Sequence, residues 1–136
     1  MKKAMNSALV YLILALGAGV FYREFTKANH FSGQTTLGVL HPHLLLLGTG
    51  VCLLVTFVFK NTQPKHLHTF FTLYQVALPM MIITMGLRGI VQVKAISLSK
   101  ALDASLSGVA GLSHLFLAVS LVYFLLAIRK NYLQES

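Results

Sequence analysis

Hydrophobic residues fall into four long blocks along the chain, and charged residues stand almost only between these blocks. A helix needs roughly 20 apolar residues to cross the hydrocarbon core of a bilayer, and each block has about that length. The pattern predicts an all-α membrane protein, a four-transmembrane-helix bundle that forms a single transmembrane domain over residues 1–136. The predicted spans are about 4–22, 39–59, 66–87 and 106–128.

Composition supports this class of protein. Hydrophobic residues make up 56% of the chain and charged residues 10%, and the mean hydropathy is +0.74. A soluble domain carries about 25% charged residues, so an ordinary soluble globular protein is excluded. The hydrophobic content also excludes a disordered chain. The net charge of +8 is best explained by lysines and arginines that cap membrane spans, so we expect the lipid bilayer as partner and no nucleic acid.

The basic residues also predict an orientation. Four spans place both termini on one side of the membrane, together with the short connection at 60–65. That side holds Lys2, Lys3, Lys60, Lys65, Arg129 and Lys130, and the other side holds Arg23, Lys27, Arg88, Lys94 and Lys100. The first six lie in compact clusters at the helix ends, which favours cytoplasmic termini.

The predicted connections at 23–38 and 88–103 are long, so the four spans divide into two helical hairpins. The second span begins with Gly-Val and then His43, and the fourth begins with Gly-Val and then His114. The span before each ends in an arginine, Arg23 or Arg88. The sequence leaves open whether this similarity is an internal duplication or chance. In either case His43 and His114 are expected at similar depth near the outer face, with both arginines in the same layer.

Histidines inside spans are costly and tend to face the bundle interior, where they serve function. Gly50 follows His43 on the helix, Gly111 precedes His114, and such small residues let a flat group approach closely. A histidine on each of two helices is what a bis-histidine haem b site requires. The residues therefore predict one haem b near the outer side, with His43 and His114 as axial ligands.

The propionates of such a haem need cationic or hydroxyl partners at the membrane surface. Arg23 and Arg88 are predicted to supply them, aided by Tyr22 or Lys27. Two axial histidines leave no open iron position, so electron transfer is favoured over gas sensing, with haem handling as a further role. A redox partner is then expected.

Other interpretations remain open. His43 and His114 can instead form hydrogen bonds that hold helices together in a non-catalytic accessory or assembly subunit without cofactor. A metal or quinone site using His41 or His68 with Tyr74 is a third reading. No carboxylate pair or nucleotide-binding motif is present, so we name no catalytic residue and favour a role other than catalysis. Small residues in the first span leave a homo-oligomer open.

Several blocks of the sequence resemble a small bacterial family of four-helix integral membrane proteins, domain-of-unknown-function family 2871. They are Gly19-Val20-Phe21-Tyr22-Arg23-Glu24-Phe25-Thr26-Lys27, Gly33-Gln34-Thr35-x-Leu37, His41-Pro42-His43-Leu44 with Leu47-Gly48, Arg88-Gly89-Ile90-x-Gln92 and Gly111-Leu112-x-His114. The resemblance implies four spans in a bacterial plasma membrane and no established activity. The histidine-headed helices are also distantly similar to the haem-binding helices of haem–copper oxidase subunit I, which implies a single haem b here by analogy.

Overall fold

The computed structural model describes residues 2–60 and 65–135, which contain helices and no strand. Helix α1 spans Lys2–Ala28, α4 spans Lys65–Val93 and α5 spans Lys100–Glu135. Between α1 and α4, α2 (Leu37–His43), the π-helix η1 (Leu44–Gly50) and α3 (Val51–Val58) follow one another without a break. This gives four helices long and apolar enough to cross a membrane. The prediction of an all-α, four-helix membrane bundle is confirmed.

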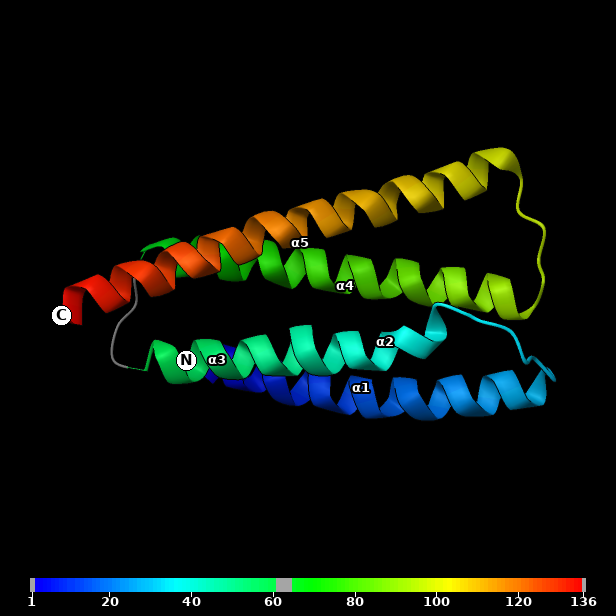
Figure 1. Ribbon diagram of the computed structural model, residues 1–136, viewed down its shortest axis with the longest axis horizontal. Coiled ribbons are helices and arrows are strands. Elements are labelled where there is room, and N and C mark those ends of the chain that lie inside the picture. The colour runs from blue at the N-terminus through cyan, green and yellow to red at the C-terminus, as the bar shows by residue number, and fades with distance from the viewer. Residues whose placement is uncertain (1, 61–64, 136) are drawn as a thin grey trace.

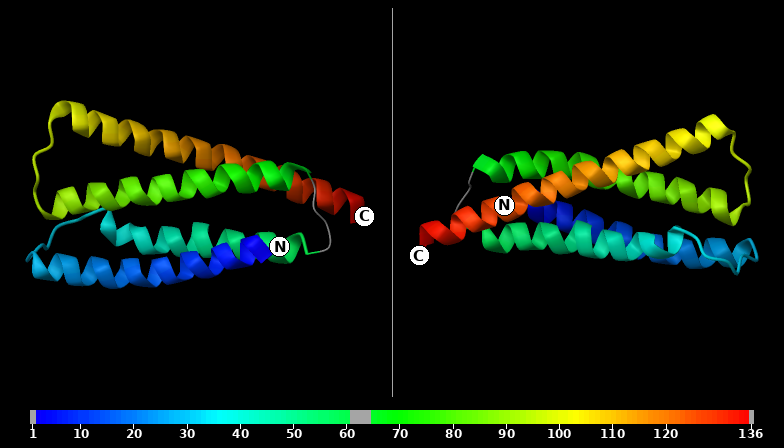
Figure 2. Two further views of the ribbon diagram at one scale, coloured as in Figure 1. Left: turned by 180° about the vertical axis from the view of Figure 1, so that it is seen from behind. Right: turned by 45° about the horizontal axis from the view of Figure 1, so that its top comes forward.

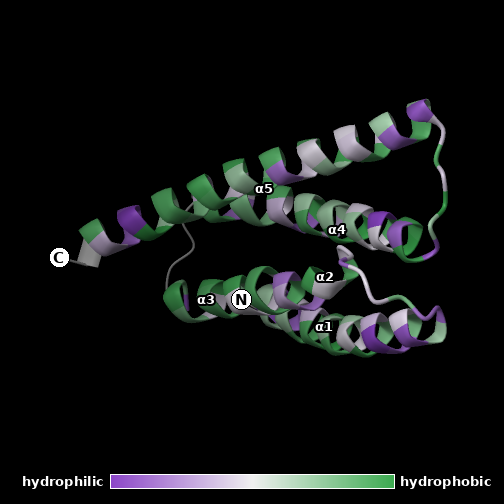
Figure 3. Ribbon diagram, turned by 45° about the vertical axis from the view of Figure 1, so that its right-hand side comes forward, coloured by the Kyte–Doolittle hydropathy of each residue, from purple (hydrophilic) through white to green (hydrophobic). Residues whose placement is uncertain are grey.

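The helices form two antiparallel hairpins, α1 with α2–η1–α3 and α4 with α5 (Figure 1). Both ends of the chain lie at one end of the molecule, and the connections 29–36 and 94–99 lie at the other (Figures 1 and 2). The hairpins meet where α2 and η1 pack against α4. Hydrophilic residues gather toward the helix ends and hydrophobic residues cover the middle, as a bilayer requires (Figure 3).

The helices continue beyond the uncharged blocks, so two connections are shorter than the sequence predicts. Arg23 lies inside α1 and Arg88 inside α4, rather than in loops. The chain has no proline near either residue, and continued helix satisfies the backbone hydrogen bonds. The third connection, predicted at 60–65, lies mostly outside the described residues.

The two hairpins end their first helices in the same way. His30 and Ala95 adopt positive φ angles of 49° and 50°, each seven positions after an arginine. At both ends the next residue donates its N–H to a carbonyl five residues back, at 3.0 Å from Phe31 and 3.1 Å from Ile96. This is the Schellman arrangement, usually built on glycine. The shared detail supports the predicted similarity of the hairpins, and duplication and chance stay the two alternatives for its origin.

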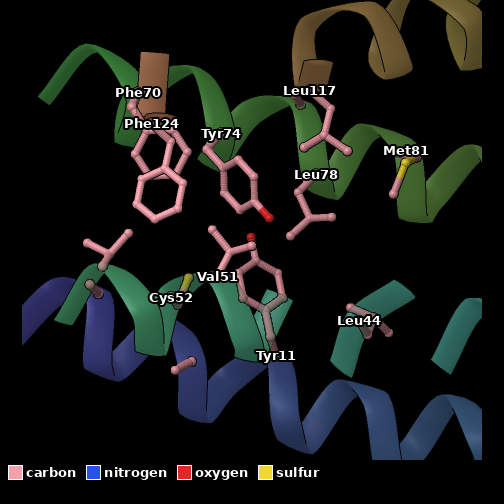
Figure 4. Close-up of a cluster of buried hydrophobic side chains, with 14 of the residues drawn as sticks. Tyr11, Leu44, Val51, Cys52, Phe70, Tyr74, Leu78, Met81, Leu117 and Phe124 are labelled. Atoms are coloured by element: carbon pink, nitrogen blue, oxygen red, sulfur yellow. The ribbon is translucent and has the colours of Figure 1, made fainter. Parts of the chain in front are cut away.

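The core joins the hairpins through aromatic and polar side chains (Figure 4). Tyr11 of α1 and Tyr74 of α4 point their hydroxyl groups toward one another from opposite sides. Tyr11 donates to Gln75 Oε1 at 2.8 Å, and the Gln75 amide donates to Ser7 Oγ at 2.6 Å. Tyr74 donates to the Leu47 carbonyl of η1 at 2.5 Å. These bonds satisfy polar groups that lipid cannot.

At the loop end, the connection 29–36 docks on α4. A Cβ on Gly89 would lie 2.5 Å from Leu37 Cγ, so this contact requires glycine. The Thr35 hydroxyl donates to the Gly89 carbonyl at 3.1 Å, and the Thr36 hydroxyl donates to the Met85 carbonyl at 2.8 Å. This joint fixes α2 relative to α4 beside the candidate site.

Candidate ligand site between the hairpins

The two predicted haem ligands make the same local hydrogen bond. His43 Nδ1 lies 2.7 Å from the Val39 carbonyl oxygen, and His114 Nδ1 lies 2.7 Å from the Ala110 carbonyl oxygen. A carbonyl only accepts, so Nδ1 carries the hydrogen and Nε2 of the neutral ring keeps its lone pair. Metal-bound histidines usually have their second nitrogen fixed in this manner. Both rings are therefore held in the tautomer that iron ligation requires.

Contacts along α4 show the depth of His43. The residue six positions earlier, Leu37, lies against Gly89, and the residue four positions later, Leu47, bonds to Tyr74. By interpolation between these two contacts, His43 lies beside the turn of α4 near Met80, slightly closer to Tyr74 than to Gly89. That point is well inside the span, some turns away from the loop end.

His114 reaches the same depth from the other side of α4. The second turn of α5 is tied to Arg88, and Phe124 stacks on Phe70 with ring centroids 4.8 Å apart. His114 lies midway between these two contacts, which corresponds to the turn of α4 near Met80. Interpolation for His43 gives the same turn. By this interpolation the two histidines lie at a similar level, near the middle of α4 rather than at its outer end. Their joint binding of one ligand stays a prediction.

Helical spacing shows the direction in which His43 points. It lies seven residues after Thr36, so two turns of helix place both side chains on one face. Thr36 lines a pocket together with His114, whereas His43 is half-buried and is not among the residues that line this pocket. His41 points away from this face, because a Cβ on Gly19 of α1 would lie 3.7 Å from its ring. His41 therefore packs toward α1, and the pairing of His43 with His114 stays a prediction.

The pocket has a volume of about 250 Å³ and lies between α4, the first half of α5 and the start of α2. Its lining residues are Thr36, Thr84, Met85, Arg88, Leu106, Ala110 and His114. The lining is mostly apolar, with one cation and one imidazole, which is the usual make-up of a small-molecule site. The sequence predicted Arg88 and His114 here and missed the others.

Arg88 is engaged inside this site. Its Nη1 forms an ion pair with Asp103, and its Nη2 donates to Ser107 Oγ at 2.5 Å. The Arg88 side chain is 29% exposed and that of Asp103 is 54% exposed. The sequence placed both residues at one end of the bundle but gave no indication of their pairing.

The remaining predicted residues lie elsewhere. Arg23 is 82% exposed and pairs with Glu24 at 3.8 Å, and Lys27 is exposed at the end of α1. The Tyr22 ring packs on Gly38, where a Cβ would approach it to 3.4 Å. None of these three α1 residues lines the pocket.

The two predicted glycines do not approach another helix, and the alternative histidine lies at the far end. A Cβ on Gly50 would meet only the Leu45 carbonyl of its own helix, at 3.5 Å, and one on Gly111 would have no neighbour within 4 Å. His68 is exposed at the start of α4, remote from the pocket. Within residues 2–60 and 65–135, no three His, Cys, Asp or Glu side chains gather to hold a metal ion.

The fold and this site define a small multi-pass membrane protein with a pocket between α4 and α5 of the second hairpin, bordered by Thr36. The chain belongs to the family described as "Protein of unknown function (DUF2871)", whose model matches residues 1–131. No curated protein and no solved structure matches the chain significantly. The similarity to haem–copper oxidase helices stays a prediction.

Proposed function

We propose that the protein binds one haem b between α2 and α5, with His43 and His114 as the axial ligands. The observation that carries this proposal is the matching hydrogen bond of the two histidines, each with Nδ1 bonded to a carbonyl of its own helix and Nε2 left for a ligand. Haem iron takes four ligands from the porphyrin, so two imidazole Nε2 atoms complete its coordination.

The pocket marks where the porphyrin enters. Its volume of about 250 Å³ is below the roughly 300–1,000 Å³ typical of small-molecule sites, so binding requires α5 to move outward. Helix α5 is suited to this movement, because it packs mainly on α4 and residues 100–105 are exposed. Arg88 and Thr36 lie at the loop end of the pocket, where the propionates would emerge.

The proposed orientation places the termini in the cytoplasm of a bacterial plasma membrane and the loop end of the pocket, where the haem propionates would lie, toward the outer side. The end that carries the termini holds six described basic residues, Lys2, Lys3, Lys60, Lys65, Arg129 and Lys130. At the loop end two arginines are paired with acids, Arg23 with Glu24 and Arg88 with Asp103. Lysines and arginines are thus more numerous among the described residues at the end with the termini, six against five, which favours this orientation.

Electron transfer to a redox partner is the role that such a haem would serve best. With both axial positions filled by protein, no iron position stays open for a gas or a substrate. Haem handling is the related role, and it would use the same two ligands with faster release.

One observation favours a second candidate, an accessory or assembly subunit without cofactor. Within the described part of the chain, every buried polar side-chain atom has a hydrogen-bond partner, and Arg88 is already paired. Such a bundle is self-sufficient without a ligand. The quinone reading has less support, because Tyr74 is bonded to Leu47 and Gln75 to Tyr11 and Ser7.

The visible spectrum of protein purified from haem-replete cells separates these functions. The haem proposal predicts a Soret band and sharp α and β bands after reduction with dithionite. His68→Ala should leave this spectrum unchanged, because His68 is exposed at the other end of α4. Folded protein that is colourless, and stays so after addition of hemin, would overturn the proposal and leave the accessory role.

A further inference from the structure

We infer that Asp103 stands in for a ligand's carboxylate on Arg88, so that the site selects flat apolar ligands with a carboxylate at their outer end. The inference rests on the proposed function and concerns how the same site recognises its ligand. It assigns Arg88 as the anion-recognition group and Asp103 as its internal competitor.

The geometry at Arg88 is that of an occupied anion site. One guanidinium nitrogen pairs with the Asp103 carboxylate and the other donates to Ser107 Oγ. Both partners lie in the first two turns of α5, whereas the Arg88 side chain also lines the pocket. Arginine holds carboxylates through two parallel N–H groups, so a propionate entering from the pocket would compete for the same nitrogens.

Charge explains why such a competitor is needed. An unpaired guanidinium in a membrane protein is costly, and the chain has only three acidic residues, Glu24, Asp103 and Glu135. Glu24 belongs to Arg23 on α1, and Glu135 lies at the opposite end of α5. Exchange of Asp103 for a ligand carboxylate keeps Arg88 paired in both states, so the exchange avoids the cost of a bare cation.

The ion pair also joins α4 and α5 where the two helices diverge. Helices α4 and α5 converge toward the C-terminus and diverge toward the connection 94–99 (Figures 1 and 2). Arg88 bridges the diverging part, because both terminal nitrogens of its guanidinium bond to α5 while its side chain also lines the pocket. Release of Asp103 therefore frees the start of α5 at the same moment that the ligand's carboxylate is bound.

The test compares metal-free protoporphyrin IX, which has two carboxylates and no iron, with its dimethyl ester, in which both carboxylates are replaced by uncharged esters. Binding to detergent-purified protein is measured by porphyrin fluorescence. Asp103→Asn should tighten protoporphyrin IX by about fivefold, the scale of a partly exposed ion pair. The ester should bind equally to both forms. Arg88→Gln should weaken protoporphyrin IX and abolish its advantage over the ester.

Glu24→Gln is the matched control, because it removes one acid at the same end of the bundle from an exposed pair outside the pocket. It should leave protoporphyrin affinity unchanged. Equal tightening by Glu24→Gln and Asp103→Asn would overturn the inference, since general attraction of an anion would explain both. So would an unchanged affinity in Asp103→Asn.

Hemin, added in parallel, separates failure of the inference from failure of the proposed function. If hemin gives a histidine-dependent Soret shift but Asp103→Asn has no effect, the haem proposal stands and the carboxylate exchange is wrong. If protoporphyrin IX shows the Asp103 effect but hemin gives no iron ligation, the carboxylate site stands and the haem assignment is wrong. If neither porphyrin binds, both are wrong.

Discussion

The two hairpins share a plan but differ in how closely their helices pack. In the first, a Cβ on Gly48 would lie 2.6 Å from Tyr11 Cβ, so η1 and α1 are in direct contact. In the second, the helices diverge toward the loop end (Figure 1), and Leu106, Ala110 and His114 of α5 line a pocket with residues of α4. The pocket lies at the open hairpin. The first hairpin is thus closely packed, whereas in the second hairpin α5 has room to move relative to α4 when a ligand binds.

The largest effect on stability should come from a methyl group added at the tight contact of the first hairpin, whereas the same change in the second hairpin should have little effect. Gly48→Ala forces Tyr11 and η1 apart and should cost about 1–3 kcal/mol of stability, as overpacking does. Gly111→Ala has room and should be neutral or stabilising, because alanine favours helix over glycine. Thermal unfolding of the detergent-purified proteins, followed by circular dichroism, measures both. Equal losses in the two variants would remove the contrast between tight and open hairpins.

The joint between the hairpins should show the next largest effect. Thr36→Val removes the hydroxyl that bonds the Met85 carbonyl, with an expected loss of about 1 kcal/mol. Thr72→Val is the control, since its hydroxyl bonds the His68 carbonyl of its own helix. Unfolding of the control at the temperature of wild type, with a lower transition in Thr36→Val, would support the joint. Identical transitions would argue against it.

The interior hydroxyl of Tyr74 should contribute least. Tyr74→Phe loses the bond to the Leu47 carbonyl, and such interhelical bonds in membranes average about 0.6 kcal/mol. Tyr132→Phe, at an exposed position of α5, is the control and should show no change. Porphyrin binding should be unaffected in both, because Tyr74 does not line the pocket. Loss of porphyrin binding in Tyr74→Phe would show that the binding site extends along α4 as far as Tyr74, farther from the loop end than we propose.

The sequence predicts the four helices because apolar blocks of spanning length permit few other structures. It also predicts the common depth of His43 and His114, since alternate helices of a bundle run in one direction. Helix ends were less accurate, because charged residues such as Arg23 and Arg88 continue a helix into the head-group layer at no cost to its backbone. The π-helix was not predicted, although Pro42 and Gly48 mark an irregular segment.

Lateral contacts account for most of what the sequence could not provide. The grouping of Arg23 with Arg88 followed from depth alone, whereas the structure places Arg23 on α1, away from the pocket. The pairing of Arg88 with Asp103 depends on the angle between α4 and α5, which no local pattern encodes. Blocks that mark the family, such as those containing Thr35 and Gly89, are in contact in the fold. The sequence alone showed only that these blocks resemble the family, not that they touch one another.

Hemin titration of wild type, three variants with one histidine replaced and one variant with two histidines replaced tests the central claim most directly. Wild type and His41→Ala should give six-coordinate, low-spin haem, because His41 packs on Gly19 away from the pocket. His43→Ala and His114→Ala should each keep one ligand and give five-coordinate, high-spin haem with weaker binding, and the double variant His43→Ala with His114→Ala should lose iron ligation. A low-spin spectrum that survives in the double variant, or one that is lost in His41→Ala, would contradict the account.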